Sequence, residues 1–114
     1  MKANSKKHLV GKWRIFHMDD TDKKDLEAEV PAYIKVESGG YGEFQFCFVH
    51  GSICGDFLRS PNGISFDFTW EGNDECDEAF GDGWFKTEDG KAGAGQIRLH
   101  YGDKYGFSAK KVKK

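Results

Sequence analysis

The stretch that decides the fold is Ile64-Ser65-Phe66-Asp67-Phe68-Thr69-Trp70-Glu71. Every even-numbered position carries a large apolar side chain and every odd-numbered position a polar one, and this period of two is typical of a β-strand with one buried face. The segment 41–50 repeats the alternation, with Phe44, Phe46 and Phe48 on one side. The sequence therefore predicts two half-buried strands.

Turn-forming residues divide the rest of the chain into similar runs. They occur at Ser38-Gly39-Gly40, His50-Gly51-Ser52, Ser60-Pro61-Asn62-Gly63, Asp89-Gly90 and Gly102-Asp103-Lys104. The runs between them predict strands over 9–18, 31–37, 41–50, 53–60, 64–71, 83–88, 94–101 and 105–111. Such a series joined mostly by tight hairpins is typical of an all-β, eight-stranded antiparallel up-and-down barrel, although a two-sheet sandwich or a rolled open sheet gives the same pattern.

Composition agrees with strands in one small domain. The chain has 114 residues, with ten Phe, three Trp, four Tyr and 15 Gly, and aromatic residues with glycine suit strands and tight turns better than helices. We expect a single domain over 9–111, with basic tails at 1–8 and 112–114. No run of about twenty apolar residues exists, so we expect no membrane span.

Charge and the N-terminal residues bear on compartment and partners. The 17 Lys and Arg nearly balance the 19 Asp and Glu, for a net charge of -2, so the positive field of a whole-domain nucleic-acid binder is missing. The basic N-terminus lacks a following apolar h-region, so we expect no secretory signal and a cytoplasmic location. Lysines gather at both ends of the chain, as solubilising tails or as one patch if the termini meet: Lys2, Lys6, Lys7, Lys110, Lys111, Lys113 and Lys114.

The three cysteines, Cys47, Cys54 and Cys76, have no C-x-x-C spacing. This argues against a disulfide framework and a zinc knuckle and favours reduced thiols. Because Cys47 and Cys54 flank the predicted turn at Gly51-Ser52, a redox pair across two strands stays open.

Two connections are longer than the rest. Residues 19–30 are highly charged and suit one helical turn capped by Thr21. Residues 72–82 form an acidic, glycine-bounded segment that we expect to be a loop. Long loops in a chain with otherwise short connections are where function concentrates.

The opening Gly11-Lys12-Trp13 resembles the Gly-x-Trp motif of lipocalins and the wider calycin group, which includes avidin-like barrels. The resemblance implies that Trp13 plugs one end of the barrel. In lipocalins an Arg of the last strand packs over this Trp. The candidate here is Arg98, in the predicted seventh strand, while the last predicted strand offers Lys110 and Lys111.

A second resemblance covers roughly residues 9–111. The segments that carry it are Gly42-Glu43-Phe44-Gln45-Phe46, Phe68-Thr69-Trp70-Glu71-Gly72-Asn73-Asp74-Glu75, Gly81-Asp82-Gly83-Trp84 and His100-Tyr101-Gly102-Asp103-Lys104-Tyr105-Gly106-Phe107. They are similar to a family of short bacterial proteins of uncharacterised function. The resemblance implies a bacterial origin, a cytoplasmic location and one small domain, and it implies no activity.

Strand parity predicts which side chains fill the barrel. An inward Trp13 takes Ile15 and His17 with it. The other expected inward residues are Phe44, Phe46, Phe48, His50, Phe66, Phe68, Trp70, Ile97, Leu99, Tyr101, Tyr105 and Phe107. So many rings predict a filled interior, so a shallow site at one barrel mouth is favoured over a deep cavity.

The candidate ligand site at that mouth is formed by His17, His50, Trp70, Asn73, Asp74, Glu75 and Tyr105. The alternative is that the histidines are rim residues bonded to loop backbone. No catalytic residue, metal site or cofactor is predicted, because the sequence lacks a nucleophile elbow, a phosphate loop and the spacing of calcium or zinc ligands. Nucleic acid is not an expected partner, since the polar positions between the Phe residues are Glu43, Gln45, Ser65, Asp67 and Glu71, which do not attract phosphate.

Three functional hypotheses follow. The first is a non-enzymatic cytoplasmic barrel that binds a small molecule at its mouth. The second is a protein-interaction module or homodimer that uses the outward residues Phe16, Val49 and Phe57 with a sheet edge. The third is an enzyme with His50 and Glu75 as acid and base.

Overall fold

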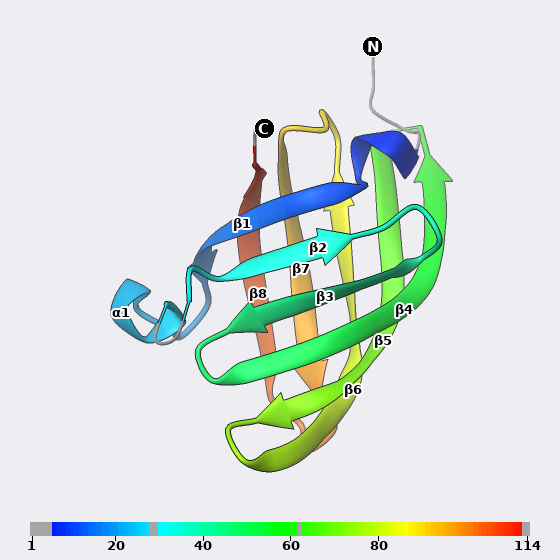
Figure 1. The fold of residues 1–114 in the computed structure, drawn as a ribbon. Helices are drawn as coiled ribbons and strands as arrows, with labels where there is room; N and C mark the ends of the chain where they lie inside the picture. Colours follow the sequence, from blue (N-terminus) through cyan, green and yellow to red (C-terminus); the bar gives the residue numbers. More distant parts are fainter. Residues whose placement is uncertain (1–5, 28–29, 62, 113–114) are drawn as a thin grey trace.

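The computed structural model describes residues 6–27, 30–61 and 63–112 as one antiparallel sheet closed into a barrel (Figure 1). Each strand pairs with the next in sequence, and β8 closes the barrel against β1. The strands are β1 (Gly11–Met18), β2 (Tyr33–Val36), β3 (Tyr41–Phe46), β4 (Val49–Ser60), β5 (Gly63–Asp74), β6 (Asp77–Thr87), β7 (Ala92–Leu99) and β8 (Lys104–Lys111). The predicted eight-stranded up-and-down barrel is confirmed.

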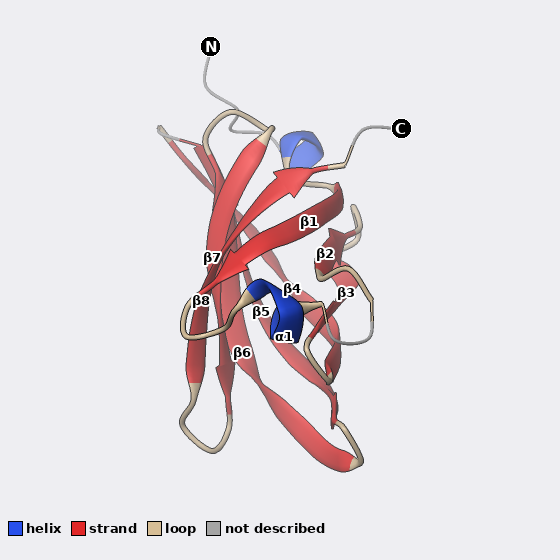
Figure 2. Ribbon diagram, turned by 90° about the vertical axis from the view of Figure 1, so that its left-hand side faces the viewer, coloured by secondary structure: helices blue, strands red, loops and turns tan. Residues whose placement is uncertain are grey.

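Two short helical segments accompany the barrel (Figure 2). A 3-10 turn, η1 (Lys6–His8), precedes β1, and one turn of helix, α1 (Lys23–Leu26), lies between β1 and β2. The predicted helical turn in 19–30 is therefore confirmed, but its cap is Asp22 and not Thr21, because the Asp22 carboxylate accepts a 3.0 Å bond from the N–H of Asp25. Within the described residues, no helix has the length and apolar character needed to cross a membrane.

The turn between β3 and β4 lies at Cys47 and Phe48, so the turn predicted at His50-Gly51-Ser52 is wrong. Those three residues continue β4. Cys47 takes a left-handed backbone with φ 51°, which makes the turn without a glycine. The earlier turn also reverses the expected parity: Val49 is buried, while Phe48 and His50 are exposed. The predicted inward positions of Phe48 and His50 and the outward position of Val49 are therefore wrong.

The acidic segment 72–82 is mostly strand and not the predicted loop. β5 continues to Asp74 and β6 begins at Asp77, which leaves only Glu75 and Cys76 for the turn. The N–H of Glu75 donates a 2.9 Å bond to the carbonyl of Phe48. The tip of this hairpin is thereby tied to the β3–β4 turn. The segment is held extended by the pairing of β5 with β4 and β6, and most of its carboxylates are exposed to solvent.

A β-bulge in β1 changes the direction of His17. The register between β1 and β8 shifts between Ile15 and His17, so Phe16 and His17 are both exposed and Met18 is buried. The predicted inward position of His17 is wrong for this reason. The outward position of Phe16, which is 50% exposed, is confirmed.

The interior of the barrel is filled mainly by aromatic rings. Trp13 meets Phe85 edge-on with ring centres 4.9 Å apart, and Phe44 meets Trp70 edge-on at 5.1 Å. Most of the predicted inward residues are confirmed as buried: Trp13, Ile15, Phe44, Phe46, Phe66, Phe68, Trp70, Ile97, Leu99 and Phe107. Tyr105 is only partly buried, and Tyr101 is 53% exposed, so its predicted inward position is wrong. Tyr101 lies beyond the end of β7, where strand parity no longer applies.

Several interior rings lie directly over a glycine of the neighbouring strand. Phe44 is the cross-strand partner of Gly51, and a Cβ at Gly51 would lie 2.6 Å from the Phe44 ring. Phe107 is likewise the cross-strand partner of Gly95, and a Cβ at Gly95 would lie 2.7 Å from the Phe107 ring. Gly51 and Gly95 therefore leave room for rings inside the barrel, whereas Gly42, Gly55, Gly72 and Gly81 lie against backbone carbonyls of neighbouring strands.

Trp13 and Lys111 close the end of the barrel where the chain begins. The Trp13 indole donates a 2.8 Å bond to the carbonyl of Leu9. The Lys111 ammonium lies 5.5 Å from the Trp13 ring centre and donates to the carbonyl of His8 at 3.2 Å. Burial lowers the pKa of Lys111. His8 and Lys111 thus lie together at this end of the barrel. Lys2, Lys113 and Lys114 lie outside the described residues.

The cation over Trp13 is therefore Lys111 and not the candidate Arg98. Arg98 lies on the outside of β7, where its guanidinium donates two bonds to the Asp82 carboxylate, at 2.7 and 2.6 Å. This ion pair raises the pKa of Arg98.

Candidate functional site

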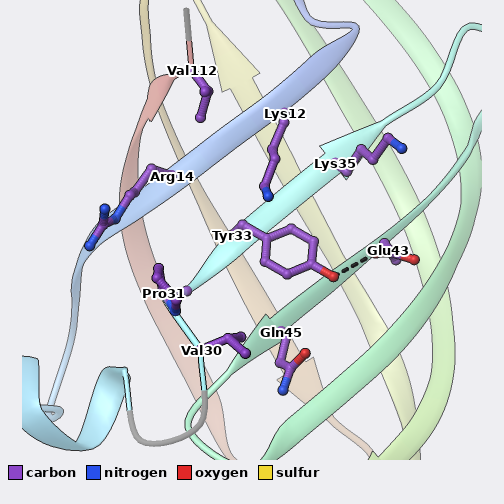
Figure 3. A pocket seen from close by; sticks show the side chains of 10 residues that line it. Lys12, Arg14, Val30, Pro31, Tyr33, Lys35, Glu43, Gln45 and Val112 are labelled. Atoms are coloured by element: carbon purple, nitrogen blue, oxygen red, sulfur yellow. Dashed lines mark hydrogen bonds between the residues drawn. The ribbon is translucent and has the colours of Figure 1, made fainter. Parts of the chain in front are cut away.

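A groove of about 600 Å³ lies on the outside of the barrel wall, over β1, β2 and β3 (Figure 3). We call it the Tyr33 groove. Its polar side chains are Lys12, Arg14, Tyr33, Lys35, Glu43 and Gln45. Val30, Pro31 and Val112 add apolar surface at its margins.

Strand alternation builds this groove. Trp13 and Ile34 point into the barrel, so their neighbours Lys12, Arg14, Tyr33 and Lys35 point out. The register then aligns them in two rows across the strands. One row runs from Arg14 to Tyr33 to Gln45, and the other from Lys12 to Lys35 to Glu43.

Tyr33 forms the floor of the groove and is held on two sides. Its hydroxyl donates a 2.5 Å bond to the Glu43 carboxylate, and the Lys12 ammonium lies 4.7 Å from its ring centre. Partial burial, followed by the hydrogen bond and the charge of Glu43, raises the pKa of Tyr33 to about 12. The phenol therefore stays neutral at physiological pH and adds no negative charge to the groove.

The cations of the groove are only partly neutralised. Lys12 and Lys35 are directly opposite each other, and like charges in this position destabilise an antiparallel pair. Glu43 faces Lys35 from β3, and Arg14 forms an ion pair with Glu27. The groove thus combines a neutral ring, three cationic side chains and one lining carboxylate already bonded to Tyr33, a set that suits an anion attached to an apolar group.

A second groove of about 390 Å³ continues across β1 to β8. We call it the Phe16 groove. Arg14 and Val112 belong to both grooves. The Lys110 ammonium lies 5.1 Å from the ring centre of Phe16, and Lys110 is the cross-strand partner of Arg14. The Phe16 groove is also lined by Lys23, Glu27 and Lys111.

The structure does not bring the predicted site residues together at a mouth. His17 points outward from β1, where its Nε2 lies 3.6 Å from the Asp19 carboxylate. His50 points outward from β4, with Gln45 on one side and Asn73 on the other in the cross-strand register. β2 and β3 lie between the two histidines.

Trp70 is separated from both histidines because it faces the interior. It is 3% exposed, and its indole N–H donates a 3.1 Å bond to the carbonyl of Arg98. It therefore contributes to the core and has no free polar atom to offer a ligand at the mouth.

Of the predicted set, Asp74 ends β5, Glu75 begins the β5–β6 turn and Tyr105 lies near the start of β8, where the charge of Asp74 reaches it. The Tyr101 hydroxyl donates a 3.1 Å bond to Asp74, and burial together with Asp74 raises the pKa of Tyr101 to about 12. Burial raises the pKa of Tyr105, and the charges of Asp103 and Asp74 raise it further. Glu75 lies at the exposed hairpin turn with φ 57°. The role of His50 and Glu75 as a catalytic pair stays a prediction.

The cysteines are free thiols, and the register does not pair Cys47 with Cys54. Cys54 lies opposite Tyr41, while Cys47 sits in the turn beyond β3. Within the part of the chain that the structure describes, no three His, Cys, Asp or Glu side chains are grouped so that they could hold a metal ion.

Sequence reasoning missed the Tyr33 groove because it followed the inward faces. The signal was present in the outward positions, Lys12 and Arg14 in one strand and Tyr33 and Lys35 in the next. Their adjacency depends on the register between β1 and β2, which the alternation alone does not specify.

Comparison with known proteins identifies no relative of this chain. No protein-family model matches the chain, and neither a curated protein nor a solved structure matches it.

Proposed function

We propose that this protein is a non-enzymatic binding module that holds a small anionic molecule in the Tyr33 groove. The observation that carries the proposal is the direct cross-strand pairing of Lys12 with Lys35. The two side chains leave the same face of the sheet, so an anion above Tyr33 attracts both ammonium groups. The site is on the outer wall and not at the barrel mouth.

The chemistry of the groove supports binding more than catalysis. Among the described residues that line it there is no histidine, cysteine or serine, and its carboxylate, Glu43, accepts the bond from Tyr33. The neutral ring of Tyr33 offers an apolar surface beside the cations. A ligand with a flat apolar part and a phosphate or carboxylate group fits these features best.

Two further points belong to the proposal. The free thiols Cys47, Cys54 and Cys76 support a reducing, cytoplasmic compartment. The plug formed by Trp13, with Lys111 of the last strand above it, supports a relation to the calycin group.

Phenyl phosphate tests the proposed site, because it joins a flat ring to a dianion. We expect it to raise the melting temperature of the protein, since a ligand present at a hundred times its dissociation constant stabilises the folded state by about 2.7 kcal/mol. Lys35→Gln should abolish the shift. Lys86→Gln, on β6, is the matched control and should retain it. A shift that survives Lys35→Gln, or no shift at all, rejects the Tyr33 groove.

A second candidate function is self-association through a groove of about 570 Å³ between Tyr41 and Phe80. Both rings are more than half exposed, and the outward residues between them are Ser52, Cys54, Thr69 and Glu71, with Ile53 and Trp70 buried beneath. The closed sheet leaves no free edge among the described strands, so a dimer needs side-chain contacts such as those the Tyr41 and Phe80 rings offer. Light scattering tests it: Phe80→Lys should convert a dimer to a monomer, and a wild-type monomer at high concentration rejects the candidate.

A further inference from the structure

The Tyr33 and Phe16 grooves join into one strip across β8, β1 and β2. We call it the basic strip, and define it by Lys12, Arg14, Phe16, Tyr33, Lys35 and Lys110. Because neighbouring strands lie about 4.8 Å apart, the strip spans roughly 10 Å across the wall. It is thus longer than one small anion needs.

The cations of the strip come in two opposed pairs. Lys12 faces Lys35 across β1 and β2, and Arg14 faces Lys110 across β1 and β8. In each pair the Cβ atoms are about 5 Å apart, and like charges on paired side chains repel. The ammonium groups of Lys12 and Lys110 lie over the rings of Tyr33 and Phe16. Glu27, through its ion pair with Arg14, offsets part of the second repulsion. Two adjacent cationic pairs suit a ligand that carries phosphates at regular intervals.

Aromatic rings lie between the cations on the same face. Phe16 is 50% exposed with Lys110 above it, and Tyr33 is partly exposed with Lys12 above it. Surfaces that bind single-stranded nucleic acid combine a cationic path for the backbone with rings on which the bases stack.

We propose that the basic strip binds a short stretch of single-stranded nucleic acid, with phosphates between the paired cations and bases against Phe16 and Tyr33. This inference rests on the proposed function, because the Tyr33 groove is one part of the strip. It extends that function by naming the ligand as a polymer whose phosphates engage both pairs.

The expectation of no nucleic-acid partner rested on five side chains, of which Glu43 and Gln45 line the Tyr33 groove. Ser65, Asp67 and Glu71 belong to β5, and Glu43 is bonded to Tyr33. The net charge of -2 also conceals a separation of charge. A groove over β4–β7 contains Asp56 and Asp67 beside the Asp82–Arg98 ion pair, so a polyanion is repelled from that wall and attracted to the basic strip.

Fluorescence anisotropy with a labelled strand of about ten thymidines tests the inference. We expect affinity to increase with strand length from thymidine monophosphate upward. Lys35→Gln combined with Lys110→Gln should lower affinity about tenfold or more and reduce the salt slope by about 1.4, that is about 0.7 for each lost phosphate contact. Phe16→Leu should weaken binding without changing the salt slope. Lys86→Gln combined with Lys104→Gln removes the same charge elsewhere and should leave binding unchanged. Circular dichroism checks that each variant is folded.

The outcomes separate this inference from the proposed function. If thymidine monophosphate or phenyl phosphate binds as tightly as the strand, the polymer inference fails and the small-ligand function stands. If none of the three binds, both fail. Strand binding that is unaffected by the Lys35/Lys110 variant overturns the basic strip as the site. Binding to vesicles of anionic lipid without binding to the strand also overturns the inference.

Discussion

The ammonium group of Lys111 lies 5.5 Å from the ring centre of Trp13 and donates a hydrogen bond to the carbonyl of His8. The last strand, the first strand and the segment before it therefore meet at a single point. Trp13 is fully buried and packs edge-on against Phe85, so it links this closed end to the aromatic interior.

Trp13→Ala should lower the free energy of unfolding by about 3–5 kcal/mol, because it removes a fully buried indole and leaves a cavity. Lys111→Met should cost less, about 1 kcal/mol or under, since the lost bond to His8 is offset by no longer burying an ammonium group. Urea unfolding measures both. If the two variants lose equal amounts of unfolding free energy, the Trp13 indole is not what closes this end of the barrel, and that role belongs to the Lys111 ammonium group.

Tyr33 and Tyr101 should ionise near pH 12 in the folded protein, above their ordinary value of 10.0. A raised phenol pKa means that the folded state keeps its proton while the unfolded state loses it. Their contribution to stability is therefore complete below pH 10 and is lost as the pH rises from about 10 to 12. Absorbance titration of tyrosinate, limited to the pH range where the circular dichroism stays native, measures the shift. Tyr33→Phe and Tyr101→Phe should each remove one phenol that ionises near pH 12. If either variant instead loses a phenol that ionises near pH 10, the raised pKa does not belong to that residue.

Gly51→Ala should destabilise the barrel by about 1–3 kcal/mol or more, because its methyl group enters the space of the Phe44 and Trp70 rings. Gly39→Ala is the control, since a Cβ there meets the Tyr41 ring at 3.4 Å, an ordinary contact. Thermal unfolding measures both. Adding Phe44→Leu to Gly51→Ala should recover part of the loss, and additive losses would show that the ring and the glycine are not coupled.

Cys54 and Cys76 should react with a thiol reagent faster than Cys47. The first two are exposed, whereas burial and the nearby carboxylates of Asp25, Asp74 and Asp22 raise the pKa of Cys47. A higher pKa leaves less thiolate to react. Ellman's reagent should therefore show a fast and a slow phase, and Cys47→Ser should remove the slow one. A single rate for all thiols contradicts this environment for Cys47.

The barrel was predictable from the sequence because the pattern in 64–71 alternates strictly and its turns are short. The turn at Cys47 was not predictable, because glycine marks turns in most sequences. Here Gly51 lies inside a strand, where it leaves room for the Phe44 ring. The bulge at Phe16 and His17 leaves no compositional trace, so parity alone placed His17 on the wrong face.

The binding surface was harder to predict than the core. Inward residues are recognised one strand at a time, by their hydrophobicity. The pairing of Lys12 with Lys35 exists only once two strands are aligned, and the pairing of Arg14 with Lys110 joins positions from opposite ends of the chain. The net charge of the whole sequence does not reveal such a surface, because acidic residues elsewhere cancel its positive charge.

The rings that lie over glycines also determine how the strands align. If β4 slipped by two residues against β3, every side chain would keep its face, but Phe44 would lie opposite Val49 or Ile53 instead of Gly51. Hydrophobic alternation does not resist such a slip, since it is unchanged by it. A large ring that fits only opposite a glycine does resist such a slip. Glycines that lie opposite rings, as Gly51 does opposite Phe44, therefore favour the observed register over a slipped one, and we expect their replacement to weaken the alignment of the strands.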